Sequence, residues 1–288
     1  RIHRQVCSSH VGEDRGRICL HNTRRPSSHG PILISQYYET RGCNVDVKDQ
    51  NRIHRLVLVV CYLAIVCMAM VGLSGADATL ARGAIEVADQ LYSRRSEPGN
   101  ADAIIAGLEQ ANKATPGDCE ILWRLSRAYW FKSTRLPEKD KKARLDLLAQ
   151  GRAYAQEATE ANPRNANAYY WLAASIAQEG QIRGILQSLA AVKPTKDALD
   201  KGLDIDPKHA SCHYLMAELY LQLPGPPLSI GNKQKAVEEA KLAVKYDPSE
   251  SCHHLVLGRA LIATKQYDEA RAVLNRLIAM APDPGDPE

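Results

Sequence analysis

Several residue types that mark particular protein classes are scarce in this chain of 288 residues. It holds one phenylalanine, three tryptophans and four methionines, so tyrosine, with 12 copies, is the main aromatic residue. Of its eight cysteines, only Cys119, Cys212 and Cys252 follow residue 78. Three is an odd number, so this long stretch does not depend on a disulfide framework.

Motifs for catalysis are also missing. The sequence contains no glycine-rich phosphate loop, no GxSxG and no HExxH. Its acidic residues stand beside lysine or arginine, as Glu238 and Glu239 stand beside Lys241, which is typical of a solvated helix face. The sequence therefore predicts a protein that is not an enzyme and that uses no metal and no cofactor.

Positive charge is not concentrated in the main part of the chain. The formal net charge is +4, but residues 79–288 carry 27 basic and 27 acidic side chains and are neutral. The excess belongs to the first 78 residues, which hold 10 basic and 6 acidic ones. A neutral array without a basic stripe argues against nucleic acid as a partner.

A recurring proline is the most informative feature that the chain does have. Helical patterns end at five prolines, at intervals of 47, 44, 41 and 34 residues: Pro116, Pro163, Pro207, Pro248 and Pro282. A small or apolar residue stands five positions before each of them: Ala111, Ala158, Gly202, Ala243 and Leu277. A spacing near 34, lengthened where extra residues separate two helices, is typical of stacked helix-turn-helix units.

The last unit shows the packing pattern most clearly. Its first helix has a spacing of i, i+3, i+4 and i+7 that places four residues on one face: His254, Leu257, Gly258 and Leu261. Small Gly258 would let the second helix, with its own stripe at Ala270 and Leu274, approach closely. The same grid fits four earlier units, most weakly the first. The sequence therefore predicts an all-α, right-handed α-solenoid of about five units over residues 79–282.

With these residues the chain resembles the tetratricopeptide repeat (TPR) family over roughly residues 80–282. The resemblance implies a solenoid whose first helices line a concave surface that binds other proteins. The insertions in the three middle units, with the run from Met216 to Glu218 and the stretch 223–232, are similar to two TPR subgroups. One is the exported bacterial TPR proteins that accompany periplasmic transport systems. The other is the eukaryotic regulators of microtubule dynamics.

An uncharged run of eighteen residues, 56–73, precedes the repeats. Basic residues come before it and small residues, 74–78, come after it, which is typical of a secretory signal cleaved after Ala78. The alternative is an uncleaved membrane anchor, because eighteen apolar residues can just span a bilayer. We therefore expect the protein to be periplasmic or secreted, or else anchored in a membrane by residues 56–73.

Four segments follow from these patterns. Residues 1–50 are expected to be a disordered or non-native leader, and residues 51–78 a signal peptide or membrane anchor. Residues 79–282 would form the repeat domain, and residues 283–288 a short tail. Within the repeat domain, residues 181–193 are expected to add a helix to the third unit. The segment 223–232, with its two adjacent prolines, is expected to be extended, either as a lip over the groove or as a rigid connector, with Asn232 as N-cap of the next helix.

Two echoing motifs, Cys212 with His213 and Cys252 with His254, raise the possibility of a metal site. Neither has the CxxC or HxxxH spacing of a tetrahedral site. Similarity between repeats is therefore the favoured interpretation, with histidine filling an aromatic place on the packing face.

Positions one step off the packing stripe face the concave side of a TPR array. In this chain those positions predict a groove of aromatic and apolar side chains with a few charges: Trp123, Arg127, Trp130, Tyr170, Tyr214, Glu218, Leu255 and Arg259. Aromatic residues with arginine are typical of binding hot spots. The alternative for the two tryptophans is burial between the units. TPR modules that clamp chaperone carboxylates have lysine and asparagine at these places, so that activity is not implied.

The sequence as a whole predicts a non-enzymatic TPR scaffold that binds another protein or peptide in its groove, in an exported or membrane-tethered setting. The alternative is a small-ligand or lipid-binding accessory component of a transport system, because the groove is apolar. The last helix carries more apolar residues than one packing stripe can bury: Val273, Leu274, Leu277, Ile278 and Met280. An exposed patch of this kind predicts self-association or partner docking through that helix. The alternative is a wide stripe that is wholly buried against residues 255–261.

Overall fold

The computed structural model describes residues 55–62, 79–283 and 285, which belong to two separate units. Residues 55–62, in the first unit, are helical and have exposed apolar side chains. The predicted leader, residues 1–50, and most of the predicted signal or anchor, residues 51–78, lie outside the described residues.

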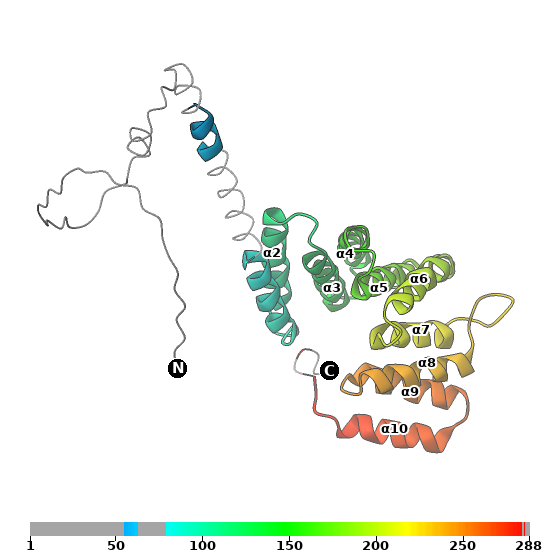
Figure 1. Ribbon diagram of the computed structural model, residues 1–288. Coiled ribbons are helices and arrows are strands. Elements are labelled where there is room, and N and C mark those ends of the chain that lie inside the picture. Colours follow the sequence, from blue (N-terminus) through cyan, green and yellow to red (C-terminus); the bar gives the residue numbers. More distant parts are fainter. Residues whose placement is uncertain (1–54, 63–78, 284, 286–288) are drawn as a thin grey trace, which may run out of the picture. The chain divides into compact units, whose positions relative to one another are not determined.

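The second unit consists of helices in consecutive pairs (Figure 1). The helical residues 79–92 form the first pair with α2 (Asn100–Ala114). Four more pairs follow: α3 (Cys119–Arg135) with α4 (Lys141–Ala161), α5 (Ala166–Arg183) with α6 (Ile185–Ile205), α7 (Ala210–Gln222) with α8 (Lys233–Tyr246), and α9 (Ser251–Ala263) with α10 (Tyr267–Ala279). This arrangement confirms the predicted α-solenoid and its division into five units.

The recurring prolines lie in the turns that end each pair. Proline cannot continue a helix, and its missing N–H is harmless in a turn. The residue before three of them is Asn162, Asp206 or Asp247, and each side chain accepts the backbone N–H two residues further on, at 3.1, 2.9 and 3.1 Å. These local hydrogen bonds fix the direction in which the next pair begins.

Polar side chains also begin the following helices. Asp118 accepts the N–H groups of residues 120 and 121 at the start of α3, and Asn165 accepts the N–H of Ala168 in α5. Asn232 accepts two backbone N–H groups at the start of α8, which confirms its predicted role as N-cap.

Small residues on the packing faces bring the helices close together. Several alanines on the packing faces of second helices are fully buried: Ala155, Ala158, Ala236, Ala240 and Ala243. A Cβ added at Gly258 of α9 would lie 2.6 Å from Cδ2 of Leu274 in α10. The close approach of helices that was predicted at Gly258 is therefore confirmed.

The third pair differs from the prediction of an added helix over residues 181–193. Instead, α5 continues to Arg183, a single residue separates the helices, and α6 is 21 residues long. Gly184 makes this abrupt change of direction possible, because its φ of 108° is open to glycine. The insertion therefore lengthens the two helices of the pair rather than adding a third.

The segment 223–232 is a closed loop rather than the extended path that its prolines suggested. The N–H of Leu228 donates to Gly225 at 3.2 Å, so the middle of the segment turns. At the base of the loop, Gly231 donates to the carbonyl of Pro224 at 3.0 Å, and Asn232 donates to that of Tyr220 at 2.8 Å.

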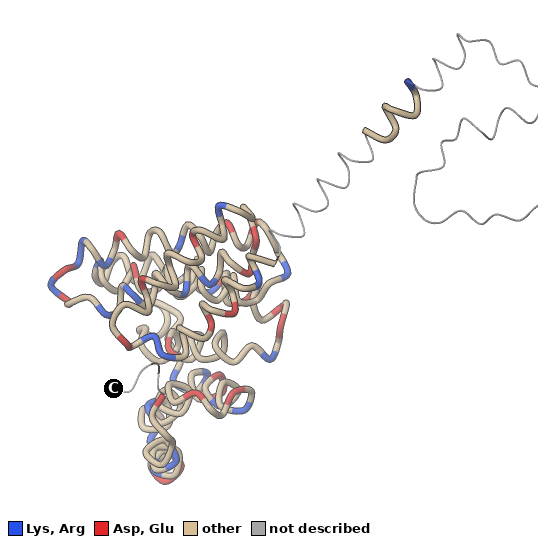
Figure 2. The backbone as a smooth tube through the Cα atoms, turned by 90° about the vertical axis from the view of Figure 1, so that its left-hand side faces the viewer, with Lys and Arg blue, Asp and Glu red and all other residues tan. Residues whose placement is uncertain are grey.

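Lysine and arginine alternate with aspartate and glutamate over the repeat unit (Figure 2). The two colours are interspersed along the tube in this view, in agreement with the neutral composition of residues 79–288.

Candidate protein-binding groove

Two tyrosines stand at equivalent places in the third and fourth pairs. The ring of Tyr170 on α5 lies 5.8 Å from that of His209, and the ring of Tyr214 on α7 lies 5.5 Å from that of His253. In each case the histidine belongs to the next helix pair. The repeated contact places an aromatic residue from each pair against the neighbouring pair, with both tyrosines partly exposed.

Tyr170 holds its hydroxyl proton more tightly than a free tyrosine does. Burial raises the pKa of Tyr170 well above its usual value, and nearby Tyr214, Cys252 and Tyr92 raise it further. These three neighbours come from the fourth, fifth and first pairs. The hydroxyl of Tyr170 therefore stays protonated at neutral pH and can donate a hydrogen bond.

The structure places Trp123 in the core rather than on an open surface. Its side chain is 7% exposed and packs with Leu122, Ala155 and Trp171 in one buried cluster. Its indole N–H donates to Glu120 at 2.9 Å. Packing between the second and third pairs, the alternative considered from the sequence, therefore accounts for this residue.

Trp130 lies further along α3 and is partly buried. Its ring meets Trp171 edge-on, with centroids 5.8 Å apart. Its indole N–H is shielded from solvent and has no hydrogen-bond partner among the described residues, and the same holds for Nε of Arg127. The Trp130 indole N–H and the Arg127 Nε–H are therefore two unsatisfied donors at predicted groove positions.

Arg127 is held at the junction of the first and second pairs. Its guanidinium lies 3.8 Å from the centre of the Tyr92 ring and donates to Asp89 at 2.6 Å. Burial lowers the pKa of Arg127, and Asp89 offsets part of that effect. Arg124 donates to the same carboxylate at 2.8 Å, so one aspartate accepts from two arginines.

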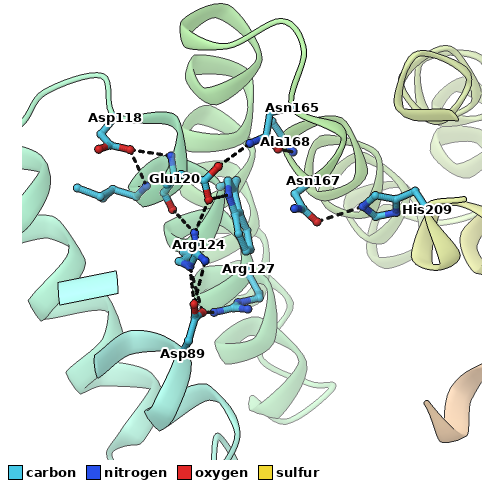
Figure 3. Close-up of polar contacts among 11 residues, drawn as sticks. Asp89, Asp118, Glu120, Arg124, Arg127, Asn165, Asn167, Ala168 and His209 are labelled. Atoms are coloured by element: carbon cyan, nitrogen blue, oxygen red, sulfur yellow. Dashed lines mark hydrogen bonds and ion pairs between the residues drawn. The ribbon is translucent and has the colours of Figure 1, made fainter. Parts of the chain in front are cut away.

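A polar network continues from this point across the second and third pairs (Figure 3). Glu120 accepts from Arg124 at 2.7 Å and from Asn165 at 2.8 Å. Asn167 of α5 in turn lies 3.1 Å from a ring nitrogen of His209. Of this network only Arg127 was among the predicted groove residues. The bonds to Asp89, Asn165 and His209 join neighbouring pairs, and the spacing within one unit does not encode them.

The fourth and fifth pairs are joined by two charged residues that were predicted separately as groove positions. Arg259 donates to Glu218 at 2.7 Å, 41 residues away along the chain. Glu218 also accepts from Gln222 one turn later. Beside this ion pair Leu255 is 46% exposed, a large apolar side chain open to a partner.

The histidines of the two echoing motifs have structural partners. His213 contacts the carbonyl of Pro207 at 3.1 Å, and His254 contacts that of Pro248 at 3.0 Å, each through Nε2. Both histidines lie six residues after the proline they contact. Within the described residues no group of three or more histidine, cysteine or acidic side chains could hold a metal ion.

Two family models match adjacent parts of the chain. The model for "Regulator of microtubule dynamics protein 1-3" matches residues 84–223, and a "Tetratricopeptide repeat" model matches residues 231–288. A solved thermophilic TPR protein of Thermus thermophilus shares the fold, with a TM-score of 0.55 over 70% of this chain and 91% of that chain, at 19% identity. The chain is a tetratricopeptide-repeat protein.

Curated relatives of this TPR protein carry the name of the second predicted subgroup. "Regulator of microtubule dynamics protein 1" of Bos taurus is 31% identical over 46% of this chain. The match covers 39% of the cattle protein, so the TPR chain spans only about two-fifths of that relative. A Caenorhabditis elegans protein of the same name is 24% identical over 67% of this chain and 88% of its own length.

These relatives correct the location that was predicted from residues 51–78. They are animal proteins named as regulators of microtubule dynamics, and animal cells have no periplasm. The predicted periplasmic location is therefore wrong. In the part of the TPR chain that the structure describes, no helix combines the length and the apolar character needed to cross a bilayer.

Proposed function

We propose that this TPR chain is a non-enzymatic scaffold whose concave groove holds a segment of another protein. The TPR fold suggests protein–protein interaction in general. Binding in the groove is supported by a tyrosine that recurs at the predicted inner positions, Tyr170 and Tyr214. Each tyrosine ring contacts a histidine of the next pair. Rigid aromatic side chains provide large contact areas with little loss of conformational entropy, and hot spots are rich in them.

The partner that fits this surface has apolar or aromatic anchors. Leu255 offers exposed apolar area on α9, and the ion pair between Glu218 of α7 and Arg259 of α9 supplies charge. The buried indole N–H of Trp130 and the Nε–H of Arg127 lack acceptors among the described residues. Backbone carbonyl groups of an extended segment would satisfy such donors if the side chains above them moved aside.

Tubulin is the partner that we propose for the first test. The support is the name of the relatives and the match of their family model to residues 84–223, which include most of the proposed groove. The purified full chain would be mixed with assembled microtubules and, separately, with soluble tubulin dimers. Co-sedimentation or a complex in gel filtration is expected. Absence of the chain from both pellet and complex at micromolar concentrations would contradict tubulin as the partner.

Cross-linking in cells, followed by mass spectrometry, would separate failure of this partner from failure of the scaffold proposal. A reproducible protein cross-linked to peptides that contain Tyr170 or Tyr214 would support the groove. Cross-links that fall only on other surfaces would contradict it.

A second interaction surface is proposed on α10. Ile278 is 81% exposed, while Val273, Leu274 and Leu277 are partly buried. A large apolar side chain in this position favours contact with a second copy of the chain through the last helix.

A further inference from the structure

The last and first helix pairs are joined by an ion pair. Asp283, in the segment after α10, accepts a hydrogen bond of 2.6 Å from Nη2 of Arg95, which lies 188 residues earlier in the turn after residues 79–92. The side chains are 15% exposed for Arg95 and 32% exposed for Asp283. In Figure 1 the red segment after α10 runs back toward the first pair. This segment, Met280–Asp283 with Gly285, is called the tail below.

Arg95 is held in place by aromatic residues rather than by the tail alone. Its guanidinium carbon lies 4.8 Å from the centre of the Tyr92 ring and 5.5 Å from that of Phe131. Nη1 also donates to the carbonyl of Tyr92 at 3.3 Å. A guanidinium that is stacked and hydrogen-bonded in this way keeps its position when its carboxylate partner leaves.

The tail is shaped to present its carboxylate to this site. The second oxygen of Asp283 accepts the N–H of Gly285 at 2.8 Å, which orients the carboxylate. Gly285 is buried, and a Cβ there would lie 2.1 Å from Nη1 of Arg95 and 3.2 Å from the carbonyl oxygen of Ser93. The backbone of the tail therefore lies so close to the first pair that no side chain would fit at residue 285. In the sequence Asp283 stands between two prolines, Pro282 and Pro284, which favour an extended backbone.

We propose that Arg95, held by Tyr92 and Phe131, is a carboxylate-binding site. Asp283 of the same chain occupies this site. The external ligand of the site is an aspartate in an extended, proline-flanked segment of a partner protein. The tail is then an internal competitor. Because it is tethered, it acts at a high effective concentration, of millimolar order, and an external segment gains the site only when the tail leaves. Arg95 lies outside the positions proposed for the groove, so this inference does not depend on them.

The experiment uses the full chain, labelled with ¹⁵N at arginine, and a synthetic peptide with the sequence of residues 279–288. The Nε–H signal of Arg95, assigned with Arg95→Gln, reports binding by nuclear magnetic resonance. In the Asp283→Asn chain, millimolar peptide is expected to shift this signal. In the unmodified chain the same shift should need about tenfold more peptide, because the tail competes. A peptide with asparagine in place of its first aspartate should not shift the Arg95 signal of either chain.

Asp268→Asn is the matched control, because Asp268 is a fully exposed carboxylate that pairs with Arg271 on α10. It should behave as the unmodified chain does. Equal shifts in the unmodified and Asp283→Asn chains would show that the tail does not occupy the site. No shift in Asp283→Asn would show that Arg95 takes no external carboxylate. A dimer that dissociates upon Asp283→Asn would show that the tail reaches a second copy. Each of these three results would overturn the proposal, and none of them bears on tubulin binding.

Discussion

The imidazole Nδ1 of His213 on α7 and a carboxylate oxygen of Glu239 on α8 lie 2.7 Å apart. The other ring nitrogen lies 3.1 Å from the carbonyl oxygen of Pro207. Both partners are acceptors, so only the protonated imidazole, with two N–H donors, satisfies both. Burial opposes the charge, but the hydrogen bonds to Glu239 and Pro207 outweigh it and raise the pKa of His213.

This pair should make stability depend on pH. The pKa of His213 is higher in the folded state than in the unfolded state. The contribution of the His213–Glu239 pair to stability is therefore fully present below the unfolded pKa, near 6.5, and is lost as pH rises through the folded pKa. Glu239→Gln is therefore expected to lower the free energy of unfolding by about 1.5–3 kcal/mol at pH 6, and by less at pH 9. Urea unfolding at both pH values measures this. Glu238→Gln, which changes the exposed neighbour, should have a small effect that is the same at both. A loss for Glu239→Gln that does not vary with pH would show that His213 does not change its protonation state between pH 6 and pH 9.

Gly180 should tolerate no side chain. It is buried in α5, and a Cβ there would lie 2.9 Å from that of Ala191, 3.2 Å from the Cα of Ser188 and 3.3 Å from the carbonyl oxygen of Gln187. Two of these atoms belong to the backbone of α6 and cannot rotate away. Gly180→Ala is expected to cost about 1–3 kcal/mol, measured by denaturant unfolding.

Gly107 provides the matched control in the interior of α2, because a Cβ there meets nothing within 4 Å. Gly107→Ala should stabilise the chain by about 0.5–1 kcal/mol through helix propensity. If the two substitutions had the same effect, the close approach of α5 and α6 would not exist in solution.

The fold could be predicted from the sequence because the patterns that indicate it are local. A proline that ends a helix, and a stripe such as His254 to Leu261, depend on residues within one or two turns, so five units and their packing faces could be located. The third pair was predicted less well, because an added helix was expected over residues 181–193. In the structure α6 runs through Pro194, and the burial of Val192 and Thr195 on either side shows that packing outweighs the cost of the proline.

The site could be predicted only in part. The grid identified inner positions such as Tyr170 and Tyr214, because these repeat with the helices. It gave no role to Asp89 or Arg95, which pair with residues 38 and 188 positions away. Contacts of this range follow from the accumulated curvature of the array, which no single unit encodes.

Substitutions on the inner surface should weaken partner binding with little loss of stability. Tyr214→Ala and Leu255→Asp are expected to reduce affinity for the partner, tubulin or the protein that cross-linking identifies, by at least about tenfold each, as hot-spot residues do. Leu186→Asp is the control, because Leu186 is an exposed leucine at the start of α6 and not a predicted groove position. Binding would be measured by co-sedimentation or calorimetry and stability by thermal unfolding. Equal affinities for all three variants would place the binding surface elsewhere.

Self-association should depend on α10. Ile278 and Ile185 are both 81% exposed, but Ile278 adjoins the apolar stripe of the last helix and Ile185 begins α6. If a second copy covers α10, the unmodified chain should form dimers or larger species at high protein concentration, because burial of such a patch removes apolar area from water. Ile278→Glu should shift it to the monomer, since a charge in a buried contact is unfavourable, whereas Ile185→Glu should leave it associated. Light scattering over a hundredfold range of concentration distinguishes these outcomes. A chain that is monomeric throughout, or that dissociates equally with either substitution, would show that α10 is not the contact.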